Sequence, residues 1–113
     1  MQNGSIKEFN VALCGGGVVG GGVCRILKER EQVFEGFGLK FHVKWILVRN
    51  VEKKRDFEVP NGAKLTSDLQ DILKDDSIHL LVEVMGGLGD AKTVVFGGLK
   101  ANKAVVTANK ALV

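Results

Sequence analysis

The stretch Phe9-Asn-Val-Ala-Leu-Cys-Gly-Gly-Gly-Val-Val-Gly20 decides the fold of this chain. Its first half, Phe9 to Cys14, is a short apolar run, which predicts a strand of a parallel sheet with both faces buried. Glycines follow at once and predict a turn. Apolar residues then recur at helical spacing and predict a helix over Val18 to Glu31, namely at Val19, Val23, Ile26 and Leu27.

The turn between this strand and this helix has the spacing Gly15-x-Gly17-x-x-Gly20. In this context Gly15 permits the tight turn, Gly17 lets the backbone approach a pyrophosphate, and Gly20 allows close helix–strand packing. The start of the helix adds N–H groups that favour phosphate. We therefore predict a dinucleotide site made by Gly15, Gly17, Val18, Val19 and Gly20. A flavin site, a methyltransferase-like site and a turn without ligand are the alternatives.

The rest of the chain continues to alternate between strand and helix patterns. The expected elements are a loop at 35–38, a strand at 41–48, a polar loop at 49–62, a short helix at 67–74, a strand at 78–84, a helix capped by Asp90 and ending near 101, a strand at 104–107 and the start of a helix at 109–113. The order β-α-β-α-β-α-β predicts an α/β fold, a Rossmann-like, doubly wound parallel sheet in three α-β-α layers. Residues 1–113 are expected to form one NAD(P)-binding domain.

The composition of the chain indicates which kinds of ligand and partner to expect. The chain has 113 residues, 45% of them hydrophobic, and a net charge of +3. This charge fits a small anionic ligand and is too weak to predict nucleic-acid binding. Cys14 and Cys24 lack disulfide or metal-ligand spacing, so we expect two reduced, buried thiols and no metal. No segment resembles a signal peptide or approaches the ~20 apolar residues of a membrane span, so the cytosol is the expected location and no membrane partner is expected.

The end of the second expected strand bears on the choice of cofactor. A carboxylate there would select NAD, but the chain has Val48-Arg49-Asn50, followed by Lys53-Lys54-Arg55. An arginine at this place can hold a 2′-phosphate through paired hydrogen bonds. We therefore expect NADP, with NAD as the alternative, and Arg49 as the main contact. Residues 53–55 are weaker candidates, because a charge run is usually a solvated surface.

Two motifs in the second half carry a family resemblance: Val82-Glu-Val-Met-Gly-Gly87 and Val105-Val-Thr-Ala-Asn-Lys110. With the glycine turn and Val48-Arg49, they make the chain similar to the homoserine dehydrogenase family over essentially its whole length. The chain departs from the family pattern at Asn50, where an acidic residue is frequent. It also departs after Gly87, where many members have a proline.

The resemblance implies roles for several residues. Lys110 matches one of two lysines implicated in the chemistry, and a lysine of lowered pKa can transfer the proton that hydride transfer at an alcohol carbon requires. Gly86, Gly87, Thr107 and Asn109 would contact the nicotinamide half of the cofactor. Without the resemblance, Lys110 reads as a surface lysine at the start of a helix. We expect Glu83 to orient the loop or to cap the strand end, and not to act as a catalyst.

The resemblance also implies the reaction: NAD(P)-dependent interconversion of homoserine and aspartate semialdehyde, on the route to threonine and methionine. The domain that binds this small-molecule substrate and forms a homo-oligomer is expected beyond Val113, so residues 1–113 alone are expected to be inactive. The alternatives are a nucleotide-sensing module without catalysis and a related enzyme such as an aspartate dehydrogenase or a semialdehyde dehydrogenase. The last would need a nucleophilic cysteine, for which Cys14 and Cys24 are wrongly placed.

Overall fold

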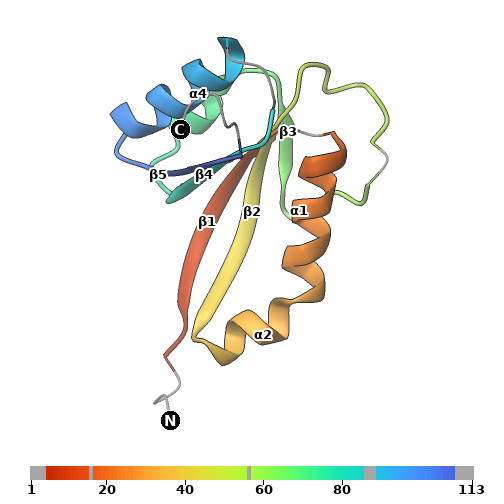
Figure 1. The fold of residues 1–113 in the computed structure, drawn as a ribbon, viewed down its shortest axis with the longest axis vertical. Coiled ribbons are helices and arrows are strands. Elements are labelled where there is room, and N and C mark those ends of the chain that lie inside the picture. Colours follow the sequence, from red (N-terminus) through yellow and green to blue (C-terminus); the bar gives the residue numbers. More distant parts are fainter. Residues whose placement is uncertain (1–4, 16, 56, 86–88, 109–113) are drawn as a thin grey trace.

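A computed structural model of the chain describes residues 5–15, 17–55, 57–85 and 89–108. Within these residues the chain forms a five-stranded parallel sheet in the order β3-β2-β1-β4-β5, with four helices (Figure 1). The elements are β1 (Lys7–Cys14), α1 (Val18–Glu29), α2 (Glu31–Gly36), β2 (Leu39–Leu47), β3 (Lys64–Thr66), α3 (Leu69–Leu73), β4 (Leu80–Glu83), α4 (Gly89–Lys100) and β5 (Ala104–Thr107).

Strand β1 lies at the centre of the sheet, with β2 and β3 on one side and β4 and β5 on the other. The chain first runs through α1 and α2 to β2 and β3, and it then returns to β4 on the other side of β1 and continues through α4 to β5. Helix α1 covers one face of the sheet, whereas α3 and α4 pack on the other (Figure 1). This arrangement confirms the predicted doubly wound fold with three layers.

The two faces of β1 explain its unbroken apolar sequence. Leu13 packs with Cys24 of α1 in one core cluster. Ala12 and Cys14 point to the opposite face, where they pack with Ile72 of α3 and with α4. Because successive side chains of a strand point to opposite faces, a strand covered on both sides must be apolar throughout. Both cysteines are free and buried, as predicted.

The prediction of four strands was wrong, because it missed β3. This strand has three residues, Lys64 to Thr66, and within the described part of the chain it pairs with β2 alone. Its three residues differ in burial: Lys64 is exposed, Leu65 is half-buried and Thr66 is buried. Three residues are too few to show the alternation by which a strand is recognised.

The helix predicted for Val18 to Glu31 is divided in the structure. Arg30, at φ −104° and ψ 14°, ends α1 and precedes α2, which occupies part of the loop expected at 35–38. Phe34 of α2 packs edge-on against Phe41 of β2, with ring centroids 5.3 Å apart, so the second helix turns back onto the sheet. The expected cap Asp90 lies instead within the first turn of α4.

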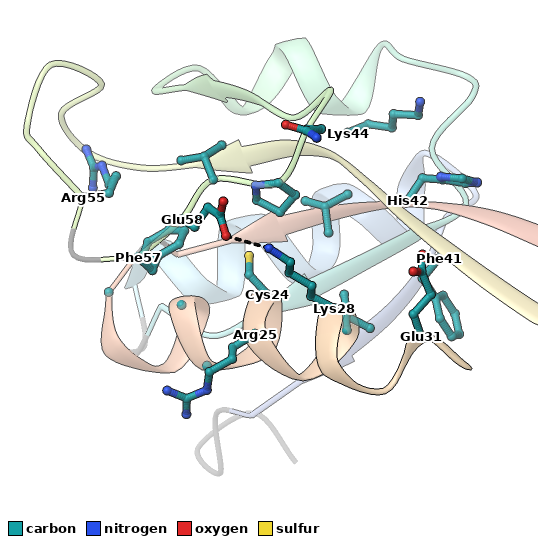
Figure 2. Close-up of a pocket in the computed structure, with 18 of the residues that line it drawn as sticks. Cys24, Arg25, Lys28, Glu31, Phe41, His42, Lys44, Arg55, Phe57 and Glu58 are labelled. Carbon is teal, nitrogen blue, oxygen red and sulfur yellow. Dashed lines mark hydrogen bonds and ion pairs between the residues drawn. The ribbon is translucent and has the colours of Figure 1, made fainter. Parts of the chain in front are cut away.

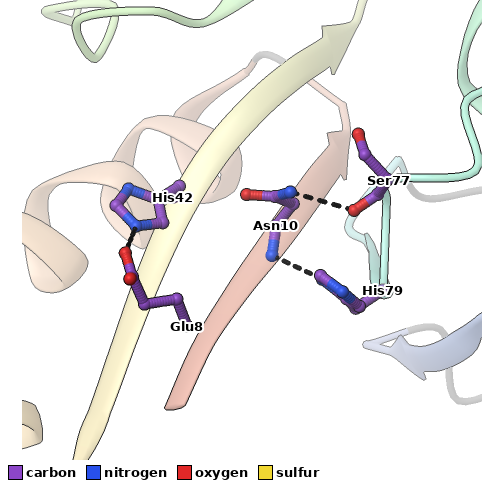
Figure 3. A network of polar contacts seen from close by, with 5 residues as sticks. All are labelled: Glu8, Asn10, His42, Ser77 and His79. Carbon is purple, nitrogen blue, oxygen red and sulfur yellow. Dashed lines mark hydrogen bonds and ion pairs between the residues drawn. The ribbon is translucent and has the colours of Figure 1, made fainter. Parts of the chain in front are cut away.

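Polar side chains join β1 to its neighbours near its amino end (Figure 3). The backbone N–H of Asn10 donates to Nδ1 of His79 at 2.9 Å, and its side-chain amide donates to the carbonyl of Ser77 at 3.0 Å. Glu8 pairs with His42 of β2 at 2.7 Å. These contacts lie far from the carboxyl ends of the strands, so they stabilise the register of the sheet.

Candidate dinucleotide-binding site

The carboxyl ends of β1, β4 and β5 lie side by side. Cys14 is in register with Glu83, and Glu83 is in register with Thr107. The chain leaves β1 toward β2 on one side and returns to β4 on the other, so the strand order reverses between β1 and β4. Open α/β sheets bind ligands in the crevice at such a switch point. The topology therefore places the candidate site directly beyond Cys14.

The turn after β1 requires glycine at two positions. Gly15 has φ +122°, and a Cβ atom there would lie 3.1 Å from the carbonyl carbon and oxygen of Val84. A Cβ atom on Gly20 would lie 2.0 Å from the carbonyl oxygen of Gly15, so the first turn of α1 rests directly on the turn that precedes it. These are the structural roles that the spacing predicts for the first and third glycines.

Gly17 differs from both, because the space beside it is open. A Cβ atom on Gly17 would meet no atom within 4 Å in the described part of the chain. Gly17 is also the N-cap residue of α1, and among the described residues this helix start has neither a capping side chain nor an acidic side chain in its first turn. The start of α1 therefore has open space beside Gly17, and N–H groups and a partial positive charge at a helix end favour an anion.

The two valines of the turn are less informative. Val19 is 56% exposed, and Val18 begins α1. Of the four apolar residues that predicted the helix, Val23 and Leu27 pack against the core, whereas Val19 and Ile26 are exposed. The line of α1 that faces the sheet includes Gly20 and Cys24, which are smaller than the helical pattern suggests.

A cavity of about 930 Å³ lies between α1, β2 and the loop that follows β2 (Figure 2), and Gly17 is among its lining residues. Phe57 packs against Gly21, where a Cβ atom would lie 3.0 Å from the phenyl side chain. Lys28 of α1 and Glu58 of the loop form an exposed ion pair at 2.8 Å across the cavity. Among the described lining residues, basic side chains outnumber the acidic Glu31 and Glu58; they are Arg25, Lys28, Lys44, Lys53, Lys54 and Arg55.

Arg55 has an unusual environment in this cavity. Its Nη2 donates to the backbone carbonyl of Asn50. Its Nε is buried and, in the part of the chain that the structure describes, has no hydrogen-bond partner. An unpaired buried donor costs about 1–3 kcal/mol. Arg49, expected as the main phosphate contact, lies two residues beyond the end of β2 and is not among the residues that line the cavity.

Glu83 is the most buried polar residue of the site, with no exposed surface. One carboxylate oxygen accepts the backbone N–H of Met85 at 2.8 Å, and the other accepts the hydroxyl of Thr107. Burial, and secondarily the charge of Glu83, raises the pKa of the Cys14 thiol to about 12. The expectation that Glu83 orients the loop fits this contact with Met85. The bond to Thr107 was not predicted.

Four predicted site residues, Gly86, Gly87, Asn109 and Lys110, lie outside the described residues. Thr107 is described and stands at the carboxyl end of β5. Among the described side chains, none of the His, Cys, Asp and Glu residues form a group of three that could hold a metal ion. The described helices include none that is long and apolar enough to cross a membrane.

A glycine turn at the switch point of a doubly wound parallel sheet defines a dinucleotide-binding domain of the Rossmann type. The family is given by comparison with known proteins. Residues 15–113 match the family described as "Homoserine dehydrogenase, NAD binding domain", and the chain belongs to this family.

Individual relatives agree with this assignment. The homoserine dehydrogenase of Bacillus subtilis is 34% identical over 108 residues, which are 95% of this chain and 25% of the relative. A crystal structure of S. aureus homoserine dehydrogenase has 40% identity and a TM-score of 0.82 over 92% of this chain and 27% of its own. The structure of a homoserine dehydrogenase from Thiobacillus denitrificans has 34% identity and a TM-score of 0.84 over 96% and 25%. The chain thus spans about a quarter of the length of these relatives.

Proposed function

We propose that this chain is the NADP-binding part of an enzyme that transfers a hydride between NADP(H) and the pair homoserine and aspartate semialdehyde. The observation that carries the proposal is the open space at Gly17, at the uncapped start of α1 and at the switch point of the sheet. Membership of the homoserine dehydrogenase family supports the reaction. Threonine and methionine biosynthesis in the cytoplasm is the corresponding cellular role.

The basic cavity supports NADP over NAD. A 2′-phosphate adds about two negative charges and several acceptor oxygens to the adenosine half of the cofactor. The residues at 53–55 line the same cavity as Gly17, and all three are basic. We therefore assign Arg55 to the 2′-phosphate together with Arg49, and we retain Lys53 and Lys54 as electrostatic contributors.

The cofactor and the protein have different roles in the proposed reaction. The nicotinamide, when bound, gives or takes the hydride. The chain contributes binding and orientation. The turn shaped by Gly15 and Gly20 holds the pyrophosphate beside Gly17, and Gly86, Gly87, Thr107 and Asn109, at and beyond the ends of β4 and β5, surround the nicotinamide half. Lys110 holds the proton that moves to or from the substrate oxygen.

The substrate requires more of the protein than residues 1–113. We propose that the relatives' remaining three quarters supply the second lysine, the substrate contacts and the homo-oligomer interface. The 113-residue chain should therefore bind dinucleotide without turning over. Nucleic acid and membrane are not partners in this proposal.

The test is a calorimetric titration of the chain with NADPH, NADH and ADP-ribose, for the wild type and for Arg49→Ala and Arg55→Ala. A lost charge-assisted hydrogen bond corresponds to about a 10-fold or larger change in Kd. We expect each variant to weaken NADPH by this factor and to leave NADH unchanged. Lys100→Ala, at the far end of α4, is the matched control and should bind all three ligands like the wild type. Equal affinity of the wild type for NADPH and NADH would refute the assignment of NADP.

A further inference from the structure

Helix α1 has three consecutive glycines near its start, Gly20, Gly21 and Gly22. Glycine weakens the interior of a helix, because it loses more backbone freedom on folding than other residues do. Gly20 is required by its contact with the preceding turn, but the other two differ from each other. A Cβ atom on Gly22 would meet nothing within 4 Å among the described residues, whereas one on Gly21 would lie 3.0 Å from three atoms of Phe57. Gly21 therefore leaves room for Phe57 to lie directly against α1.

Phe57 fixes the loop after β2 on the rest of the domain. Its side chain is half-buried and packs against the core cluster that α1 shares with β1 and β2, and Val59 packs against the same cluster. The neighbouring Glu58 pairs with Lys28 of α1 at 2.8 Å, but both side chains are largely exposed. An exposed ion pair contributes little to stability. The apolar contacts of Phe57 and Val59 therefore hold this part of the loop against α1.

The basic residues at 53–55 lie between Phe57 and a second fixed point, Asn50. Two oxygen atoms of Asn50 accept backbone N–H groups, that of Glu52 at 2.9 Å and that of Lys53 at 3.3 Å. The three basic residues and Phe57 line one cavity, and Arg55 and Phe57 stand at the same end of it (Figure 2). Because two residues of extended chain span only about 7 Å, a displacement of Phe57 is passed on to Arg55.

We infer that Gly21 and Phe57 are positioning residues that place the basic residues 53–55 for the 2′-phosphate, and so set the preference of this chain for NADP over NAD. This inference rests on the proposed function. A charge-assisted hydrogen bond joins donor and acceptor over about 2.7–2.9 Å, so a small shift of the loop weakens it. A methyl group on Gly21 would force such a shift, by a few tenths of an ångström, because an ordinary contact is 3.4–4 Å and not 3.0 Å. The preference therefore depends on the close approach of the loop to α1.

The test uses two ligands that differ in the 2′-phosphate alone: ADP-ribose and 2′-phospho-ADP-ribose. Kd for both is measured by calorimetry on the 113-residue chain, and the ratio of the two values is the preference. We expect the wild type to prefer the phosphorylated ligand by about 10-fold or more, as one charge-assisted hydrogen bond allows. Because both ligands carry the same pyrophosphate, a change in pyrophosphate binding alone leaves the ratio unaltered.

Gly21→Ala and Gly22→Ala form a matched pair of variants. Both replace a glycine in the same turn of α1, but only Gly21→Ala places a methyl group against Phe57. Gly21→Ala should lower the ratio by about 3-fold or more, as a weakened hydrogen bond allows, whereas Gly22→Ala should keep the wild-type ratio. Phe57→Ala removes the aromatic anchor and should lower the ratio at least as far. Phe57→Leu keeps an apolar side chain against α1 and should keep the preference.

Urea unfolding shows which variants are folded. An unchanged ratio in Gly21→Ala, or in a folded Phe57→Ala, overturns the inference. An equal fall of the ratio in Gly21→Ala and Gly22→Ala also overturns it, because the effect would then belong to the helix and not to the loop. If Phe57→Ala does not fold, the matched pair still decides.

The wild type separates this inference from the proposed function. A wild-type preference for 2′-phospho-ADP-ribose that none of these variants changes overturns this inference alone. A wild-type chain that binds both ligands equally overturns the assignment of NADP, and this inference with it. A wild-type chain that binds neither ligand overturns the proposed function as a whole.

Discussion

Substitution by alanine should affect stability at Gly20 and ligand affinity at Gly17. In Gly20→Ala the new methyl group would lie 2.0 Å from the carbonyl oxygen of Gly15. This obstacle is backbone and cannot rotate away, so α1 would have to move by about an ångström from the end of β1, at a cost of about 3 kcal/mol or more. Alanine recovers about 1 kcal/mol of helix propensity. The net loss of stability is about 2 kcal/mol or more.

In Gly17→Ala the new methyl group meets nothing within 4 Å of the described residues, and φ of −88° suits an alanine. Alanine lowers the conformational entropy of the unfolded chain, which stabilises the folded state by about 0.4–1 kcal/mol. Alanine is also a weaker N-cap residue than glycine, which offsets this gain by a similar amount. Stability should therefore stay within about 1 kcal/mol of the wild type. The methyl group would stand where the pyrophosphate approaches, so ADP-ribose should bind at least about 10-fold more weakly.

The assay for both variants is urea unfolding followed by the fluorescence of Trp45, whose indole N–H donates to Asp75 at 2.8 Å in the folded chain. Calorimetry with ADP-ribose gives the affinity. A Gly20→Ala chain as stable as the wild type would refute the close packing of α1 on the turn. A Gly17→Ala chain with unchanged affinity would refute the position of the pyrophosphate.

Two further predictions concern stability and reactivity. Burial raises the pKa of the Cys14 thiol to about 12 and that of the Cys24 thiol above its usual range. At pH 8 neither thiol should therefore react with a disulfide reagent faster than the chain unfolds, whereas both should react at once in guanidinium. A thiol that reacts rapidly in the native chain would contradict the packing of these cysteines. Hydrogen bonds from Ser77 and Trp45 hold the pKa of Asp75 below its ordinary value of 3.8, so the stability that this carboxylate contributes is complete above that value and is lost as the pH falls through the lower, folded-state pKa. The urea midpoint of the wild type should then fall more steeply below pH 4 than that of Asp75→Asn, and parallel pH profiles would show that these bonds do not contribute.

Elements of the fold could be predicted from the sequence where the local pattern and the tertiary structure agree. The glycine spacing, the apolar run before it and the helical run after it all describe one strand–turn–helix unit, and β1 and α1 form it. The strand predicted at 104–107 matches β5 residue for residue. Strand β3 and the break at Arg30 could not be predicted in this way, because the first depends on pairing with β2 and the second on the docking of Phe34 against Phe41.

The candidate site was predictable at the turn and less so elsewhere. Lys53 to Arg55 form a charge run, which in most sequences is surface; the fold of the loop around Phe57 brings these residues to the cavity. The bond between Glu83 and Thr107 joins residues 24 positions apart, and it follows from the register of β4 with β5. Register is a property of the assembled sheet, so no local pattern revealed this contact.

The most direct test of the central claim is an NMR titration of the ¹⁵N-labelled chain with NADPH. If the dinucleotide binds at the switch point, the backbone amides of Gly15, Gly17 and Gly20 should shift most, together with those of the basic loop at 53–55 and of Met85. The amide resonances of residues away from the carboxyl ends of the strands, including Asn10 and His79, should not shift. Saturable binding with shifts confined to other surfaces, or no shift at the glycine turn at millimolar NADPH, would contradict the account.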